Sequence, residues 1–374
     1  MSLLQPMAER ILGSRALAAL TSPHSVDRYL EQINPMWAAA EVRARVVQII
    51  HETSGEHPVA TLVLQPTSTW RGHRAGQYVQ VGVEINGARR TTRCFSISSA
   101  ESGPGEQFSI TVRAHDEAKP GQQRVSRFLV REAQPGQIVH LSQAEGQFTL
   151  TESPATPSNN ELLMISGGSG ITPVMSQIRT LLRDGYDGRA NRKRVTFLHY
   201  ARSAEDQIFA EELNRISWQD NGIDVHLRHG DEHFSAEALA RLVPNFRDVD
   251  TWACGPAPMM SLVADAYGDS PRLRTEFFKV STTAAIDGDS ADGEVAFNQA
   301  GKTAPNSGAS LLEQAEAMGL TPEYGCRMGI CFSCVSRKTE GTVRNVLTGE
   351  ESSLPDEDIR ICVSAPVGSC SVDL

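Results

Sequence analysis

Four cysteines near the end of the chain have the spacing of ligands to an iron–sulfur cluster. The segment EYGCRMGICFSC places Cys326, Cys331 and Cys334 in a C-x4-C-x2-C arrangement, and Cys362 follows in IRICVSAP. Iron in a cluster is soft and prefers thiolate ligands, and this spacing is typical of [2Fe–2S] centres. The four cysteines are therefore predicted to bind such a cluster.

The alternative for these cysteines is a zinc site or a set of inert core thiols. Zinc sites usually come as two separated C-x2-C pairs, whereas this sequence has one asymmetric triplet. Cys94 and Cys370 lie outside the quartet and are interpreted as small buried hydrophobic residues. The spacing thus favours iron over zinc.

The segment RCFS, Arg93 to Ser96, has residue types that suit a flavin nucleotide. Arg93 can pair with a pyrophosphate, Phe95 can stack on a ring, and Ser96 can donate a hydrogen bond near the flavin N5. A short helix predicted from Ser126 to Arg131 offers backbone amides to a phosphate, which favours FAD over FMN. A plain helix cap is the alternative for Ser126.

The segment ISGGSGITPVMS follows an apolar run and is predicted to open a helix, with Thr172 as its cap and Pro173 at its first position. Gly168 and Gly170 let the backbone approach a pyrophosphate. The third glycine of the dinucleotide fingerprint is absent, so this segment alone is a weak signal. In HYARS, Arg202 stands where an acidic residue would bind a ribose 2′-hydroxyl, which favours NADPH over NADH; a solvated arginine is the alternative.

The elements around these segments predict several domains in the 374 residues. Residues 1–40 indicate a helical lead-in, and residues 41–155 indicate short strands of an antiparallel β-barrel. In residues 156–280 strands alternate with helices, as in an α/β domain with a parallel sheet; one of these helices is predicted over residues 204–216. Residues 281–292 form a polar linker, and residues 293–374 a third domain.

The charge distribution argues against a nucleic-acid partner, because the formal net charge is −10. Residues 281–374 hold fourteen acidic and six basic residues, a difference of −8. This acidity favours a basic docking surface on a partner protein, although a solvated loop explains it equally well. No export signal or membrane span is predicted, and the chain is expected in the cytoplasm, with peripheral membrane association left open.

These motifs resemble those of a known family. Residues 293–374 resemble the plant-type [2Fe–2S] ferredoxins, which implies a β-grasp fold. RCFS resembles the R-x-Y-S motif of the ferredoxin–NADP reductase superfamily, with Phe95 in place of the tyrosine, and G-G-x-G-I-T-P is the form of the glycine loop that this superfamily uses. The second phosphate motif departs from the family pattern, because Gln123 stands where glycine is expected.

The resemblance also implies roles for residues that carry no signal by themselves. CGPAPMM resembles the superfamily's C-G-P motif, which implies that Cys254, Gly255 and Pro256 face the nicotinamide. Glu276 stands where related reductases place a residue beside the flavin. Ser96, Cys254 and Glu276 are therefore the expected catalytic residues.

The order of modules resembles the oxygenase-reductase branch of this superfamily and implies an NAD(P)H-dependent flavoenzyme. A nicotinamide gives up a hydride and a cluster carries one electron, so a flavin must lie between them. The segment VDRYLEQINPMWAAAEVRARV resembles the lead-in of bacterial reductases that serve membrane di-iron acyl-CoA Δ9 desaturases. The alternatives are a reductase for a Rieske-type, aromatic or alkane oxygenase, and a zinc-binding module without catalysis.

Overall fold

The computed structural model describes most of the chain in two compact units, Met1–Glu276 and Phe277–Leu374. The described residues are 26–84, 91–114, 125–151, 155–186, 194–277 and 292–374, without 323, 325–328 and 330–333. The predicted helical lead-in lies largely outside them, and so does the predicted linker. The domain boundaries given above remain predictions.

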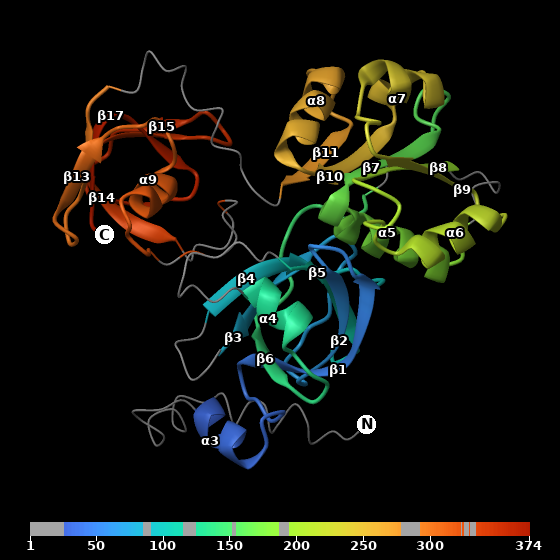
Figure 1. Cartoon of the computed structure of the whole chain (residues 1–374), viewed down its shortest axis with the longest axis horizontal. Coiled ribbons are helices and arrows are strands. Elements are labelled where there is room, and N and C mark those ends of the chain that lie inside the picture. Colours follow the sequence, from blue (N-terminus) through green and yellow to red (C-terminus); the bar gives the residue numbers. More distant parts are fainter. Residues whose placement is uncertain are drawn as a thin grey trace. The chain divides into compact units, whose positions relative to one another are not determined.

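An antiparallel sheet forms the first part of the N-terminal unit (Figure 1). Its strand order is β4-β3-β6-β1-β2-β5. The strands are β1 (Val42–Thr53), β2 (Val59–Pro66), β3 (Tyr78–Val83), β4 (Thr91–Ser96), β5 (Phe108–Arg113) and β6 (Ile138–Leu141). A bridge between Ile97 and Ile110 joins the two edge strands, which closes the sheet on itself. This confirms the predicted barrel.

The barrel has an apolar interior and one short helix. Leu62, Val79 and Ile110 are among its fully buried side chains. Helix α4 (Val125–Arg131) contacts β4 and β5 and buries Val125 and Leu129. Residues 115–124, which include Gln123 of the second phosphate motif, lie outside the described part of the chain.

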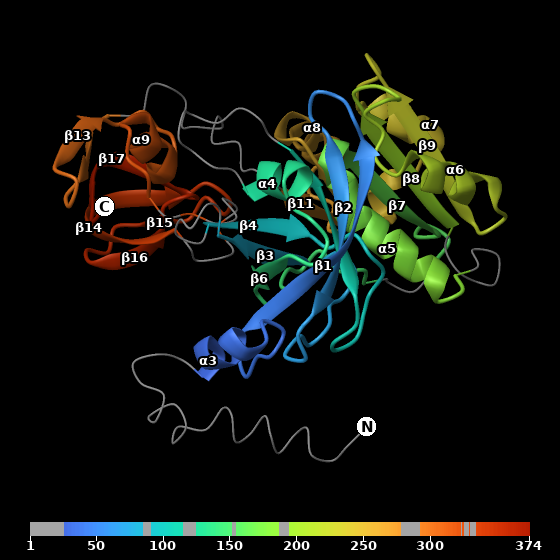
Figure 2. The same ribbon diagram turned by 60° about the horizontal axis from the view of Figure 1, so that its bottom comes forward.

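The described end of the lead-in is helix α3 (Val26–Ile33), seen in Figure 2. Asp27 is buried and accepts hydrogen bonds from the backbone N–H groups of Ala39, Ala40 and Glu41 at 2.5, 3.0 and 3.2 Å. A carboxylate with three amide donors is a fully satisfied buried charge. These bonds fix the helix to the start of β1.

A parallel sheet of order β11-β10-β7-β8-β9 follows in the same unit. Its strands are β7 (Glu161–Gly167), β8 (Arg194–Ala201), β9 (Ile223–His229), β10 (Asp250–Gly255) and β11 (Leu273–Phe277). Its helices are α5 (Ile171–Arg183), α6 (Ala210–Trp218), α7 (Ala236–Leu242) and α8 (Ala257–Tyr267), with 3-10 turns at Gly168–Gly170 and Phe246–Asp248. Figure 1 shows α5 and α6 on one face and α7 and α8 on the other, which confirms the α/β prediction.

Two predicted helix starts are wrong. The 3-10 turn Gly168–Gly170 leads directly into α5 at Ile171, so Thr172 is not the cap; its hydroxyl lies inside the helix and donates to the Ser169 carbonyl at 2.9 Å. Helix α6 begins at Ala210 and not at residue 204. Phe209 adopts φ of 59°, a left-handed conformation that an α-helix cannot continue through.

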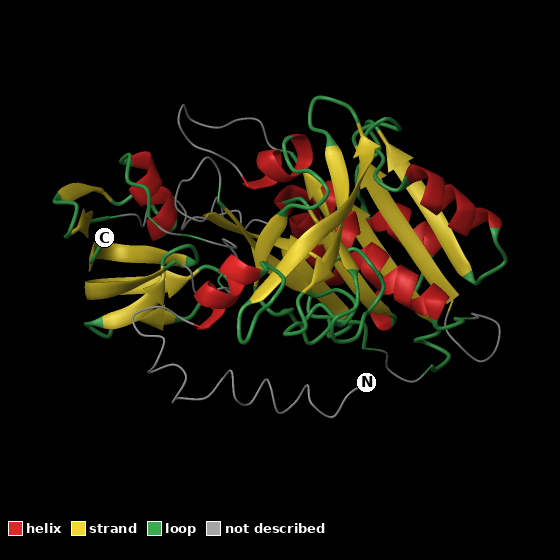
Figure 3. Cartoon of the chain, turned by 90° about the horizontal axis from the view of Figure 1, so that it is seen from below, coloured by secondary structure: helices red, strands yellow, loops and turns green. Residues whose placement is uncertain are grey.

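The C-terminal unit is a mixed sheet of order β13-β12-β17-β14-β15, with β16 paired to β14 (Figure 3). Its elements are β12 (Glu294–Phe297), β13 (Lys302–Pro305), α9 (Leu311–Ala317), β14 (Val335–Asn345), β15 (Glu351–Ser352), β16 (Glu357–Arg360) and β17 (Ser364–Val372). Ser310 caps α9 by accepting from the Glu313 N–H. Leu311 and Leu312 belong to the same buried cluster as Phe297 and Val372, which confirms the predicted β-grasp arrangement.

Among the residues that the structure describes, no helix is long and apolar enough to cross a membrane.

Candidate flavin and nicotinamide site and cluster ligands

The predicted flavin residues lie on β4, which does not alternate between buried and exposed positions. Residues Thr91 to Phe95 are all half-buried, and Ser96 is buried. The Arg93 guanidinium donates to the Thr92 carbonyl at 2.7 Å, and Phe95 lies against the barrel core. Arg93 and Phe95 are therefore partly accessible on β4, whereas the Ser96 hydroxyl is buried.

Ser96 tests whether this surface fits a flavin. Its Oγ is buried and has no hydrogen-bond partner among the described residues. A buried hydroxyl without a partner is costly, and a bound ring nitrogen would satisfy it. Ser126 is half-buried in the first turn of α4, as predicted. These residues fit the predicted cofactor.

Glycines bring the two nicotinamide motifs into contact at the carboxyl edge of the parallel sheet. Cys254 pairs with Ser166 in the β10–β7 register, directly before both loops. A Cβ on Gly170 would lie 2.2 Å from the Cys254 carbonyl oxygen, and one on Gly255 would lie 2.5 Å from the Met259 methyl carbon. At Gly170 only glycine permits this approach, because the neighbouring atom is backbone, whereas the Met259 methyl group beside Gly255 is the end of a flexible side chain. Ligands of open α/β sheets bind at such an edge.

Cys254 and Glu276 lie close enough to influence each other electrostatically. Burial raises the pKa of the Cys254 thiol, and the charge of Glu276 raises it further. Burial also raises the pKa of Glu276 from 4.5 to about 8, and its Oε2 is buried without a partner in the described part of the chain. Both groups therefore hold their protons at neutral pH, and one oxygen of Glu276 remains for a further hydrogen bond.

Arg113 is a functional candidate that the sequence analysis missed. It ends β5 of the barrel, yet its Nη2 lies 4.0 Å from the position of a Cβ on Gly168. Burial and the neighbouring Arg202 lower the pKa of Arg113, while Asp206 raises it, and its Nε is buried without a partner among described residues. An arginine beside a glycine loop suits a pyrophosphate. In the sequence, the only sign of a role for Arg113 was a positively charged residue at the end of an apolar strand.

Arg202 is exposed at the end of β8, as predicted. The Gly230 N–H donates to the Arg202 carbonyl at 3.0 Å, which joins the ends of β8 and β9. This contact places Arg228 and His229 on the same edge; Arg228 forms an ion pair with Glu232 at 3.1 Å. Arg202, Arg228 and His229 therefore bring nitrogen groups to the ends of β8 and β9.

Two of the four predicted cluster ligands are described. Cys334 and Cys362 are both buried, whereas Cys326 and Cys331 lie outside the described residues. The Ile361 N–H donates to the Cys334 carbonyl at 3.2 Å, so the segments that hold the two described thiols run side by side. Their chemistry and burial fit a cluster.

Gly329 lies in the sequence between Cys326 and Cys331, and two residues of the segment 360–363 contact it. Its φ is 71°, and a Cβ there would lie 2.8 Å from a methyl group of Val363. The Arg360 guanidinium donates to its carbonyl. The segment 360–363 therefore carries one predicted ligand, Cys362, and supports Gly329 and Cys334.

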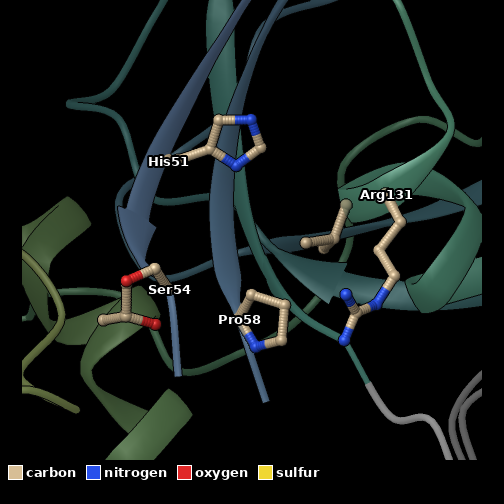
Figure 4. Close-up of a pocket in the computed structure, with 6 residues that line it drawn as sticks. His51, Ser54, Pro58 and Arg131 are labelled. Carbon is tan, nitrogen blue, oxygen red and sulfur yellow. The ribbon is translucent and has the colours of Figure 1, made fainter. Parts of the chain in front are cut away.

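The cavity drawn in Figure 4 lies elsewhere. It has a volume of about 320 Å³ and is lined by His51, Thr53, Ser54, Pro58, Val130 and Arg131. None of the predicted cofactor residues belongs to it.

The barrel, the parallel sheet with its glycine loop and the buried cysteine pair define an electron-transferring flavin reductase with an iron–sulfur domain. Comparisons with known proteins agree with this class. Residues 164–265 match the family described as oxidoreductase NAD-binding domain, and residues 295–367 match the 2Fe-2S iron-sulfur cluster binding domain.

The chain is 36% identical to a Mycobacterium tuberculosis protein named NADPH oxidoreductase, over 98% of this chain and 94% of that one. It is 29% identical to the glycine betaine monooxygenase reductase subunit of Pseudomonas aeruginosa, over 91% and 98% of the two chains. The solved structure of phthalate dioxygenase reductase superposes with a TM-score of 0.56 at 20% identity, covering 89% of this chain and 98% of that one.

The chain therefore belongs to the ferredoxin–NADP reductase-type oxidoreductases with a C-terminal [2Fe–2S] domain. It uses a nicotinamide, a flavin and a [2Fe–2S] cluster. The alternative of a zinc module without catalysis has no support in these matches.

Proposed function

We propose that this reductase takes a hydride from NADPH onto FAD and delivers single electrons through its [2Fe–2S] cluster to a membrane di-iron fatty acyl-CoA desaturase. The observation that carries the hydride step is that Ser96, Cys254 and Glu276 are each buried, and that side-chain oxygens of Ser96 and Glu276 lack partners among the described residues. When bound, the flavin supplies the exchange between a two-electron hydride and one-electron transfers.

Each residue of this set has a distinct task. Ser96 would donate a hydrogen bond to a bound flavin ring and so fix its position, and Phe95 would offer that ring a stacking surface. Cys254 stays a neutral thiol, because burial raises its pKa, and it limits how the nicotinamide can lie. Glu276 stays protonated at neutral pH and can donate to an acceptor from its unpartnered oxygen. A dry site of this kind holds the reacting carbon and nitrogen in a fixed approach.

The other predicted contacts hold the phosphates. Gly168, Gly170, Thr172, Pro173, Gly255 and Pro256 shape the loops at the nicotinamide edge. Arg93 and Ser126 are assigned to the flavin pyrophosphate, which supports FAD over FMN. Arg113 is assigned to the nicotinamide pyrophosphate, opposite Gly168.

The preference for NADPH over NADH rests on Arg202 and its neighbours. Arg202, Arg228 and His229 place basic groups at the ends of β8 and β9, which suits a 2′-phosphate. The M. tuberculosis relative is named an NADPH oxidoreductase, which supports the same choice.

An anaerobic titration of the purified protein with NADPH and with NADH, followed by absorbance, tests these assignments together. NADPH should bleach the flavin bands and then the broad cluster absorption. Arg202→Gln should weaken the binding of NADPH about tenfold and leave the binding of NADH almost unchanged, because only NADPH carries the 2′-phosphate. Equal losses for both nucleotides would refute the assignment of Arg202.

The desaturase is proposed as the acceptor from the likeness of residues 26–46 to reductases that serve such enzymes. The same segment exposes Tyr29, Ile33 and Trp37, with Ile33 71% exposed. Trp and Tyr side chains favour the membrane–water interface, where a membrane-bound acceptor would be met. This surface supports the proposal.

Reconstitution with NADPH and desaturase-containing membranes is the direct test. The protein should introduce a double bond, whereas an unrelated reductase at equal cytochrome c reductase activity should not. Ile33→Ser should reduce desaturation more than cytochrome c reduction.

A second candidate acceptor is a Rieske-type, aromatic or alkane oxygenase. It is favoured by the relative named glycine betaine monooxygenase reductase subunit, and by the 3-ketosteroid-9-alpha-monooxygenase reductase component of M. tuberculosis, 27% identical over 78% of this chain. Turnover with a purified Rieske oxygenase but not with desaturase membranes would favour this candidate.

A further inference from the structure

Helix α5 connects the nicotinamide loop to the flavin strand inside the N-terminal unit. It begins at Ile171, immediately after the turn that contacts Cys254. Most of its residues are buried. A polar stripe on α5 meets the backbone of residues 98–101, which follow Ser96.

The stripe consists of residues spaced as neighbours on one helix face. Ser176 Oγ donates to the Ser99 carbonyl at 2.6 Å, and the Glu101 N–H donates to Thr180 Oγ1 at 2.9 Å. Arg183 donates to the Glu101 carbonyl. The bonds of Ser176 and Thr180 fix the distance between the two modules along the helix, whereas the Arg183 bond lies at the exposed end of the stripe.

Arg179 lies at the centre of the stripe and makes the largest number of distinct contacts. Its Nη1 donates to the Ser98 carbonyl at 2.5 Å. Its Nε and Nη2 donate to the two oxygens of Glu212 on α6 at 2.9 and 2.5 Å. The guanidinium also lies 4.4 Å from the ring centroid of Phe209. A bidentate pair of this kind has a defined geometry as well as energy.

The flavin end of this contact is rigid. The Ser98 N–H donates to the Ser109 carbonyl at 2.8 Å, and Ser98 Oγ lies 2.8 Å from Thr111 Oγ1 on β5. Because Ser98 is tied to the barrel on its other sides, its carbonyl holds the Arg179 guanidinium at a fixed place relative to Ser96, two residues earlier. The other end is equally fixed, since Phe209 and Glu212 open α6 after the Arg202 segment.

We propose that Arg179 is a positioning residue for the hydride step, which sets the approach of the nicotinamide to the flavin by joining the Ser96 strand to α5 and α6. This inference rests on the proposed hydride transfer. A misplacement of about 1 Å can slow such a step about 100-fold.

The test uses the full-length protein with its flavin and cluster, reduced anaerobically by saturating NADPH in a stopped-flow instrument. Arg179→Met should slow flavin bleaching about tenfold. In this variant the primary isotope effect measured with C4-deuterated NADPH should differ from that of the wild type. The flavin content and the cluster absorption should stay as in the wild type. Arg179→Lys, which retains the charge and one donor, should recover part of the rate.

Arg183→Met is the matched control. Arg183 lies one turn further along α5, is 48% exposed and contacts the same segment, residues 98–101, at Glu101. It should change the bleaching rate by less than about twofold, because surface contacts contribute little. Where Arg179→Met does not fold, Glu212→Gln gives the second test, and an intermediate slowing is expected.

Two results would overturn the proposal. The first is that Arg179→Met bleaches at the wild-type rate and with the wild-type isotope effect. If Arg179→Met does not fold, the same result in Glu212→Gln would overturn the proposal. The other is equal slowing in the Arg179 variant and in Arg183→Met. Failure of the wild-type protein to bleach with either nucleotide would instead refute the proposed function.

Discussion

The two redox sites of this chain are built in opposite ways. The described part of the cluster site depends on a short stretch of chain, residues 360–363, which carries Cys362 and reaches Gly329 and Cys334 through two hydrogen bonds within the C-terminal unit. The hydride site draws its side chains from β4, β5, β10 and β11, far apart in the sequence. The first should fail completely when one ligand is lost, whereas the second should lose function by degrees.

The largest expected effect is therefore at the cluster. Cys334→Ser should abolish the cluster absorption and reduce cytochrome c reductase activity more than about 100-fold, because the cluster is the one-electron outlet. Bleaching of the flavin by NADPH should remain within about twofold of the wild type. Anaerobic absorbance and a steady-state cytochrome c assay measure the two outcomes.

Cys370→Ser is the control for this variant, since Cys370 is equally buried in the same unit but lies outside the quartet. It should keep the cluster. Loss of the cluster in both variants would show that the effect of Cys334→Ser comes from unfolding.

The next largest effect is expected at Ser96. Ser96→Ala removes a buried donor without a partner among described residues and should slow flavin bleaching about 100-fold, while cluster reduction by dithionite is unchanged. Ser99→Ala is a matched control, because the Ser99 hydroxyl already accepts from the Ser109 N–H at 3.0 Å. If both serine variants bleach at the same rate, Ser96 has no special role in the hydride step.

A smaller effect should separate the two arginines at the nicotinamide edge. Arg113→Gln should weaken NADPH and NADH equally, about tenfold, because both nucleotides carry the pyrophosphate. Dissociation constants from titration of the oxidised protein give the measurement. If only NADPH binding were weakened, Arg113 would have to contact the 2′-phosphate. That result would contradict the assignment of Arg113 to the pyrophosphate opposite Gly168.

The same contrast explains what the sequence could reveal. The cysteines, RCFS and the glycine loop are local patterns, so the three kinds of cofactor and the order of modules follow from them. Arg113 was missed because it reaches the glycine loop from another sheet, a contact that only the tertiary fold creates. Strand β9 was not predicted, because all but its first residue are half-buried and the strand lacks a strong period.

The helix starts show the complementary error. Thr172 and Pro173 have the residue types of a helix start, but the flexible glycines before them allow a 3-10 turn that shifts the start to Ile171. Local propensity was overridden by the close approach of Gly170 to Cys254.

The smallest expected effect concerns pH and Glu276. Its pKa is about 8 in the folded protein and 4.5 as the ordinary value, so the folded state binds more protons between these pH values. Stability should then fall as pH rises from about 5 to 8, because ionisation in the buried site is unfavourable. In Glu276→Gln this part of the pH dependence should disappear, and the variant should gain thermal stability relative to the wild type at pH 8.5 but not at pH 5. Melting temperatures of the two proteins across this pH range measure this difference, with Glu232→Gln as an exposed control. Parallel curves for the wild type and Glu276→Gln would show that Glu276 titrates normally. That outcome would remove its assigned role as a proton-holding group beside Cys254.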